Sequence, residues 1–318
     1  YIAEDFTNNP NTQNISELRN SWLKAYISWQ AVEMFNIGYA EEIYYASKMN
    51  IYPANTTRIL ENIYSDNVDL DENSNQFSAQ GFPAIDYLLF GVAENNIQIL
   101  DIYSIDNNST FTYLNLLVSK MIDNTDAVID YWETNRQDFI NSTGNTSSSS
   151  LNMLANDFVY YYEKGLRANK VGIPAGVFSG GPLKGNVEAF YKKDLSKVLL
   201  LEAMDASIKF YNGTSFDGIS SGPSLKSYLT HLNSTKEGSS LSSLVATKLE
   251  TAKSQINSLS NNFISQIESD NNKMLTAYDA IQAVVVLLKV DMLQAFNINV
   301  DYTCLLYTSD AADEGLGV

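Results

Sequence analysis

Asp86 is the single charged residue in an otherwise apolar and aromatic segment, Gly81–Gly91 (GFPAIDYLLFG). The glycine and Pro83 predict the start of a helix, because proline suits a first helical turn whose N–H groups lack partners. An acid in that first turn would stabilise the positive end of the helix dipole by about 0.3–1 kcal/mol. An acid that faces an apolar helix surface instead needs a polar partner. The sequence leaves both roles open for Asp86, a helix-stabilising residue or part of a polar pocket.

Glu33 is the second carboxylate with a capacity for chemistry, because it follows a row of aromatic residues. It is preceded at intervals of three or four by Trp22, Tyr26 and Trp29, which places all four residues on one helix face. A carboxylate on such a face is expected to be partly buried, and buried carboxylates are usually hydrogen-bonded or paired with a cation. The candidate partners are Arg167, Lys170 and Lys289. A structural ion pair between two helices is favoured slightly over ligand binding.

Catalysis by a zinc ion or by a serine triad is disfavoured by the scarcity of histidine. The one histidine, His231, lies in a polar stretch. Zinc sites usually need two or three nitrogen or sulfur ligands, and neither a His-Glu-x-x-His helix nor a nucleophile-elbow pattern occurs. The acidic segment Asp69–Asn75 resembles the start of an EF-hand loop, but Ser74 replaces its glycine and Gln80 its glutamate. A solvated acidic loop is therefore favoured there.

Helices must position these residues, because apolar side chains recur at intervals of three and four along most of the chain. A capping pattern of Asn14 with Glu17 predicts the start of the first long helix. Further helices are predicted over Phe111–Ile140, Leu151–Arg167, Asp194–Tyr211, Ser239–Glu268 and Lys273–Phe296. Glycine and proline argue against regular helix in Ala168–Gly185, and convincing strands are absent. The predicted fold is all-α, with two helical bundles of the four-helix type.

The polar, low-complexity segment 141–150 (NSTGNTSSSS) is the best candidate for a linker. It separates a predicted N-terminal bundle, residues 1–140, from a predicted C-terminal bundle, residues 151–303. Residues 304–318 look like the translation of a sequencing adapter and are set apart from the fold. They include the single cysteine, Cys304, so neither disulfides nor thiol chemistry are expected.

Composition excludes two classes of function. The net charge of −17 over 318 residues is the opposite of what a nucleic-acid backbone attracts. No segment reaches the length and purity of a membrane span, because the most apolar run, Ala283–Leu288, is followed at once by Lys289. The first residue is Tyr1 rather than methionine, so we expect the sequence to begin inside a longer product.

Several segments in order resemble the imelysin family of bacterial cell-envelope proteins. The signature of this family is Gly-x-His-x-x-Glu. Gly81 matches it, whereas Pro83 stands in place of the histidine and Asp86 in place of the glutamate. Other segments similar to family motifs are Ser21–Gly38, Tyr52–Pro53, Arg167–Pro174, Val187–Tyr191 and Leu288–Asp291. The resemblance implies two bundles packed side by side, export to the periplasm or the outer membrane as a lipoprotein, and a link to iron uptake.

The predicted function is non-catalytic binding in a cleft between the bundles, because a proline can neither bind a metal nor move a proton. The predicted cleft residues are Glu33, Asp86 and Arg167 as polar lining, Trp29 and Phe82 as apolar walls, and Gly81 and Pro83 beside them. The resemblance implies iron, another divalent cation or an envelope protein as the partner, and any lipid anchor would lie outside this sequence. No metal ligands are assigned. The alternatives are a metal-dependent peptidase, the activity that named the family, and a structural surface protein.

Overall fold

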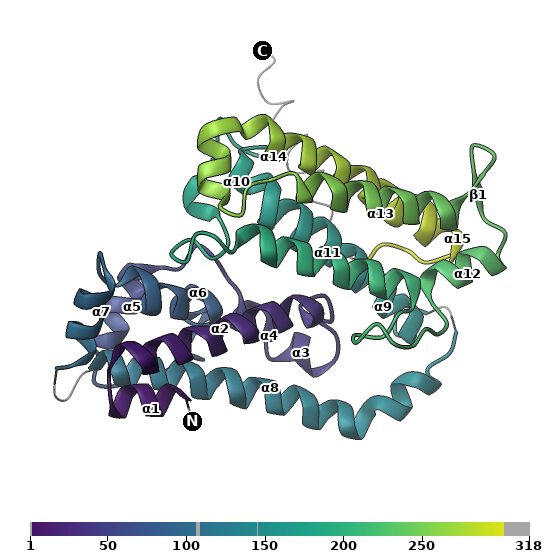
Figure 1. The fold of residues 1–318 in the computed structure, drawn as a ribbon. Helices are drawn as coiled ribbons and strands as arrows, with labels where there is room; N and C mark the ends of the chain where they lie inside the picture. The colour runs from purple at the N-terminus through teal and green to yellow at the C-terminus, as the bar shows by residue number, and fades with distance from the viewer. Residues whose placement is uncertain (1, 106–108, 145, 302–318) are drawn as a thin grey trace, which may run out of the picture.

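The computed structural model describes residues 2–105, 109–144 and 146–301, and in these ranges the chain forms two layers of helices (Figure 1). The lower layer in Figure 1 contains the first half of the chain and the upper layer the second half. A two-residue hairpin of β1 (Thr235–Lys236) and β2 (Ser239–Ser240) is the sheet present in the described part. The predicted all-α class, with two bundles side by side, is confirmed.

Most of the helices in the first bundle are short and surround two long ones. They are α1 (Ile2–Asn8), α2 (Thr12–Val32), α3 (Tyr39–Glu42), α4 (Tyr45–Met49), α5 (Thr56–Ile63), the 3₁₀ turn η1 (Ser74–Ala79), α6 (Gly81–Asp86), the π-helical turn η2 (Tyr87–Gly91), α7 (Asn96–Tyr103) and α8 (Ser109–Asn141). The long helix α8 matches the prediction for Phe111–Ile140 closely. The predicted capping pattern was wrong by three residues, because Asn11 caps α2 by accepting from the N–H groups of Gln13 and Asn14.

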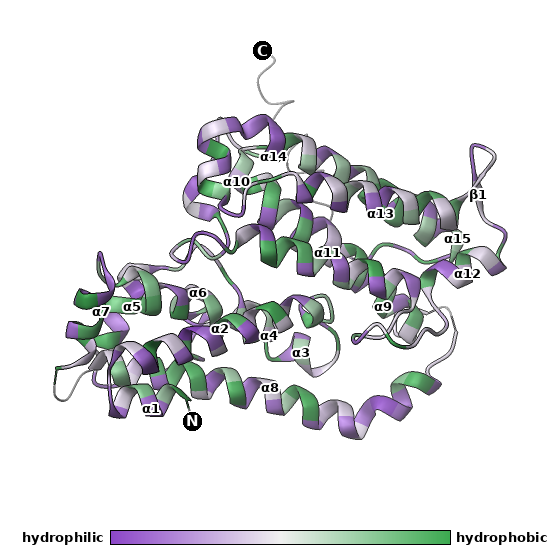
Figure 2. Cartoon of the chain, viewed as in Figure 1, coloured by the Kyte–Doolittle hydropathy of each residue, from purple (hydrophilic) through white to green (hydrophobic). Residues whose placement is uncertain are grey.

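The second bundle continues after the polar segment 141–150. Its elements are α9 (Ser150–Tyr160), the π-helix η3 (Tyr161–Gly172), α10 (Ile173–Ala175), η4 (Lys184–Asn186), α11 (Ser196–Asn212), α12 (Leu225–His231), α13 (Leu241–Asn257), α14 (Phe263–Val286), the π-helical turn η5 (Leu287–Met292) and α15 (Leu293–Ala295). Figure 2 shows polar and apolar patches alternating along the long helices of both layers, as expected for helices that bury one face.

Two predicted boundaries in the second bundle were wrong. Helical structure continues beyond Arg167 through η3 and α10 as far as Ala175, where regular helix was not expected. The predicted helix Ser239–Glu268 is interrupted, because α13 ends at Asn257 and α14 begins at Phe263. The predicted division between Glu268 and Lys273 corresponds instead to a kink at Asp270 within α14, where φ is −161° and ψ is 86°.

Each bundle buries its own apolar core, yet each core contains residues from the other half of the chain. The core of the first bundle includes Ala189, Leu195 and Leu199. The core of the second includes Met34. The linker position between α8 and α9 agrees with the segment chosen from the sequence, while the division into two domains stays a prediction.

Each helix in the described ranges is too short or too polar to cross a lipid bilayer. The residues attributed to a sequencing adapter, 304–318 with Cys304, lie outside the described part of the chain.

Candidate functional site: a buried polar network between the bundles

The ammonium group of Lys170 lies between two carboxylates that come from different parts of the chain. Its Nζ atom is 2.7 and 2.8 Å from the two oxygens of Glu188 and 3.3 Å from Oε2 of Glu33. Lys170 belongs to η3, Glu33 follows the end of α2, and Glu188 lies in the loop after η4. The side chains of Lys170 and Glu188 are each only 2% exposed, and that of Glu33 is 13% exposed. This ion-pair group therefore joins the two bundles across a buried boundary.

Neutral side chains complete the network. The Nδ2 group of Asn50 donates to Glu33 at 2.8 Å and to Glu188 at 2.9 Å, so it ties the two carboxylates together. Tyr26 donates its hydroxyl to the Asn50 oxygen at 2.7 Å, and Tyr161 donates to Glu33 at 3.2 Å. The side-chain amide of Gln30 also donates to Glu188, at 3.2 Å.

The electrostatics of the network leave it negatively charged. Burial lowers the pKa of Lys170, but the charges of Glu188 and Glu33 outweigh burial and raise the pKa above its usual value, so this residue stays an ammonium. Burial and the same two carboxylates raise the pKa values of Tyr26 and Tyr161 well above the usual value, so both phenols stay neutral. Two glutamates and one lysine give the network a formal net charge of −1.

Asp86 is the last residue of α6 and holds a neighbouring loop. Its carboxylate accepts from the backbone N–H groups of Tyr191 at 2.8 Å and Lys192 at 3.0 Å. Burial raises the pKa of Asp86 to about 7, although these two N–H groups lower it. Of the two roles that the sequence left open, stabilisation of the helix start does not apply, because Asp86 lies in the second turn of α6 and its bonds go to another segment. Since that segment begins three residues after Glu188, Asp86 positions the loop that supplies this carboxylate.

The start of α6 fixes two further parts of the network. Gly81 has a φ of +73°, and a Cβ atom on it would lie 2.2 Å from the carbonyl oxygen of Met49, the residue before Asn50. The ring of Phe82 stacks on Tyr26 with 4.5 Å between centroids and 2° between planes. Pro83 is buried in the same turn. The start of α6 therefore packs directly against Tyr26 and against Met49, the neighbour of Asn50.

Arg167 belongs to a separate group of contacts in the second bundle. Its guanidinium is 3.7 Å from Glu163, and it donates to Tyr278 at 3.2 Å and to Gln282. The second carboxylate oxygen of Glu163 is 2.6 Å from Lys289. Of the three cations predicted as partners of Glu33, the structure therefore pairs Lys170 with it.

Four residues of the network were not predicted from the sequence as site residues: Glu188, Asn50, Gln30 and Tyr161. Glu188 had a signal, because it lies in a segment that resembles a glutamate-containing family motif. Asn50 follows α4 directly, and nothing in its local sequence distinguishes it from other asparagines. Two atoms beside the network, Nε1 of Trp29 and Oε1 of Gln30, are buried without a hydrogen-bond partner.

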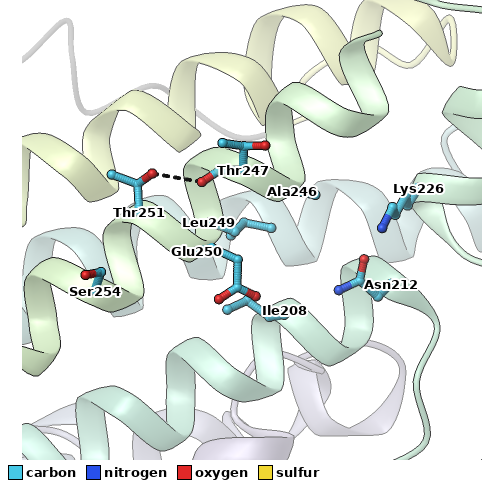
Figure 3. Close-up of a pocket in the computed structure, with 9 residues that line it drawn as sticks. All are labelled: Ile208, Asn212, Lys226, Ala246, Thr247, Leu249, Glu250, Thr251 and Ser254. Atoms are coloured by element: carbon cyan, nitrogen blue, oxygen red, sulfur yellow. Dashed lines mark hydrogen bonds between the residues drawn. The ribbon is translucent and has the colours of Figure 1, made fainter.

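Four hollows of between about 460 and 590 Å³ open on the described part of the chain, and none of these four is lined by Glu33, Asp86 or Arg167. Figure 3 shows one of them, in which Glu250 of α13 and Lys226 of α12 point into a space beside Ile208 of α11. Phe82 lines another hollow, in the first bundle. Apart from Arg167, the predicted cleft residues lie in or beside the polar network, and the role of all of them in ligand binding stays a prediction.

The network does not have the ligand set of a permanently bound metal. The described residues contain no group of three or more histidine, cysteine, aspartate or glutamate side chains that could hold a metal ion. In the network two carboxylates share an ammonium instead. Its oxygen donors suit hard cations such as calcium, magnesium or manganese, which prefer carboxylate and carbonyl oxygens.

Comparisons with known proteins converge on one family. A sequence profile of the imelysin family matches residues 2–290. The fold is similar to that of an imelysin-like protein from Psychrobacter arcticum 273-4, with a TM-score of 0.70, 17% identity, and coverage of 95% of this chain and 88% of that one. It is also similar to a putative iron-regulated protein A precursor from Parabacteroides distasonis ATCC 8503, with a TM-score of 0.73, 16% identity, and coverage of 93% and 87%. No curated protein matches the chain.

Proposed function

Since this chain belongs to the imelysin family, we propose that it is a non-catalytic binding protein that holds a cation reversibly at the network around Glu33 and Glu188. Iron is the cation that we propose first, because a structural neighbour is described as a putative iron-regulated protein. Export to the bacterial envelope, implied by the family resemblance, is part of the same proposal. The cation is cargo here, since the network lacks the ligands of a resident metal cofactor.

The residual charge of the network is the observation that carries this proposal. A buried charge without a counter-charge costs several kcal/mol, and an added cation would reduce that cost. Glu33 is the carboxylate that an incoming cation could reach from solvent, because its side chain is 13% exposed, whereas those of Lys170 and Glu188 are each 2% exposed. The unpartnered oxygen of Gln30 gives an incoming cation a further oxygen ligand beside Glu188.

Two features favour binding over peptide hydrolysis. Pro83 occupies the position of the signature histidine, and proline has no group that can bind a metal or transfer a proton. Burial and the adjacent carboxylates hold the phenols of the network in their protonated forms, and the carboxylates hold the lysine as an ammonium against the effect of burial. The network therefore offers hydrogen-bond donors and negative charge, which suit holding a cation.

Calorimetric titration with Fe²⁺ under anaerobic conditions, and with Mn²⁺ and Ca²⁺, tests the proposal. We expect saturable binding that Glu33→Gln weakens at least about tenfold, equivalent to about 1.4 kcal/mol. Glu42→Gln, which neutralises an exposed glutamate on α3 outside the network, should leave the affinity unchanged. Binding that survives Glu33→Gln, or no binding of any of the three ions, would refute a cation site at this network.

The peptidase alternative has its own signature. It predicts cleavage of an unstructured protein substrate that a chelator abolishes and that Asp86→Asn removes. Cleavage with both properties would replace the binding proposal. A protein with neither cation binding nor cleavage would be left with the structural surface role.

A further inference from the structure

A hollow in the first bundle is separate from the polar network and has a different character. It has a volume of about 500 Å³ and lies between α1, α2, α6 and α8. Its floor is formed by buried apolar side chains, which include Trp22, Phe82 and Ile85. Small-molecule sites usually have volumes of about 300–1,000 Å³ and mostly apolar walls. The size and the lining of this hollow both fall within that description.

The hollow lies between α2 and the part of α8 that is not buried in the core. Along α8 the buried residues end at Leu117. Beyond that point Val118, Met121 and Ile122 face the hollow, and Ile122 is 42% exposed. Apolar side chains therefore line both walls of a space that the chain itself does not fill, so an apolar ligand would bury them.

Polar groups are confined to part of the lining. They are the hydroxyl groups of Ser21 and Thr125 and the carboxylate of Asp126. Thr125 already bonds to Tyr45 at 2.8 Å. Asp126 is exposed and has no ion pair among the described residues, so it is the charged group available to an incoming ligand. A cation is the complementary charge.

We propose that this hollow binds a single-chain aliphatic molecule with a cationic head group. The aliphatic chain of the ligand lies between Trp22, Phe82 and Met121, and its head group pairs with Asp126. This site is distinct from the cation network, since none of Glu33, Lys170 and Glu188 lines the hollow.

The binding of the aliphatic chain is tested by calorimetry with alkyltrimethylammonium ions of eight, ten and twelve carbons, each below its micelle-forming concentration. We expect one molecule per protein, with an affinity that rises about fourfold for each added methylene until the hollow is full. Ala25→Trp should abolish binding, because this exposed residue lines the hollow and a large ring there would fill it. Asn20→Trp is the matched control, because it adds the same ring at an exposed position of α2 outside the lining, and it should bind normally.

The head group is tested by charge. We expect Asp126→Asn to weaken binding of the twelve-carbon ammonium about tenfold, and dodecyl sulfate to bind the native protein more weakly than the ammonium. Equal affinities for the two head groups would overturn the role of Asp126. Binding that has no fixed stoichiometry, or that Ala25→Trp leaves intact, would overturn the site itself, because it would show general attraction to an acidic protein.

Discussion

The carboxyl group of Asp86 should make the protein less stable as the pH rises from about 4 to about 7. Its pKa is raised from 3.8 to about 7 by burial. Between these values the folded protein holds a proton that the unfolded chain has released. The stability that this proton confers is present in full below pH 3.8 and is lost as the pH rises through 7. Replacement by asparagine, which does not titrate, removes this dependence.

The size of the effect follows from the shift. Each pH unit in the window changes the free energy of unfolding by about 1.4 kcal/mol for one proton. Over the roughly three units between 3.8 and 7, the largest change is therefore about 4 kcal/mol. Asp86→Asn also replaces one acceptor of the Tyr191 and Lys192 N–H groups by a donor, at a cost of about 1–3 kcal/mol. The variant should be less stable than the native protein at pH 5, by a margin that shrinks towards pH 8.

Urea unfolding followed by circular dichroism between pH 4.5 and 8, at constant ionic strength, measures this margin. Asp157, whose pKa burial also raises to about 7, titrates in the same window in both proteins and therefore cancels in the difference. Asp101→Asn, at an exposed position on α7, is the control and should follow the native profile. A margin between native protein and Asp86→Asn that stays constant with pH would refute this reasoning.

Further predictions concern the supports of the network. Gly81→Ala should lower stability by about 2 kcal/mol or more in thermal unfolding, because it combines a positive φ with a Cβ contact of 2.2 Å to Met49, whereas Gly180→Ala enters open space and should have little effect. Lys170→Met leaves two buried carboxylates without their cation and should cost about 3–5 kcal/mol in urea unfolding. Lys184→Met, which breaks an exposed pair, should cost about 1 kcal/mol or less, and equal losses in the two lysine variants would contradict the assigned burial.

The fold was predictable wherever a helix carries both a buried stripe and a stop signal. For α11 the predicted end at Tyr211 is one residue from the observed end at Asn212, where Gly213 with a φ of 72° stops the helix. The break before Phe263 was missed, because residues 258–262 (SLSNN) contain neither glycine nor proline. Helical structure nevertheless continues from η3 through Pro174 to Ala175, where the glycine and proline content predicted its end, and both Pro174 and Ala175 are buried.

The candidate site was predictable in part for a similar reason. Glu33 was found because a carboxylate on an aromatic helix face needs a partner, and Lys170 was among the partners named. Glu188 and Asn50 were missed because they lie on connections, whose positions are set by the packing of distant helices and not by a local period. The separation of Arg167 from Glu33 was missed for the same reason, since its neighbours on α14 are more than a hundred positions away in sequence.

The exchange of core residues between the halves has a consequence for how the molecule could be divided. A protease that cut the backbone between α8 and α9 would produce two polypeptides. Met34 of the N-terminal piece would stay buried in the core of the second bundle, and Leu195 and Leu199 of the C-terminal piece in the core of the first. The nicked pieces should therefore migrate together under native conditions and come apart in denaturant. Either piece produced on its own would expose the part of its apolar core that residues of the other piece normally cover. Mixing the two pieces should re-form the complex.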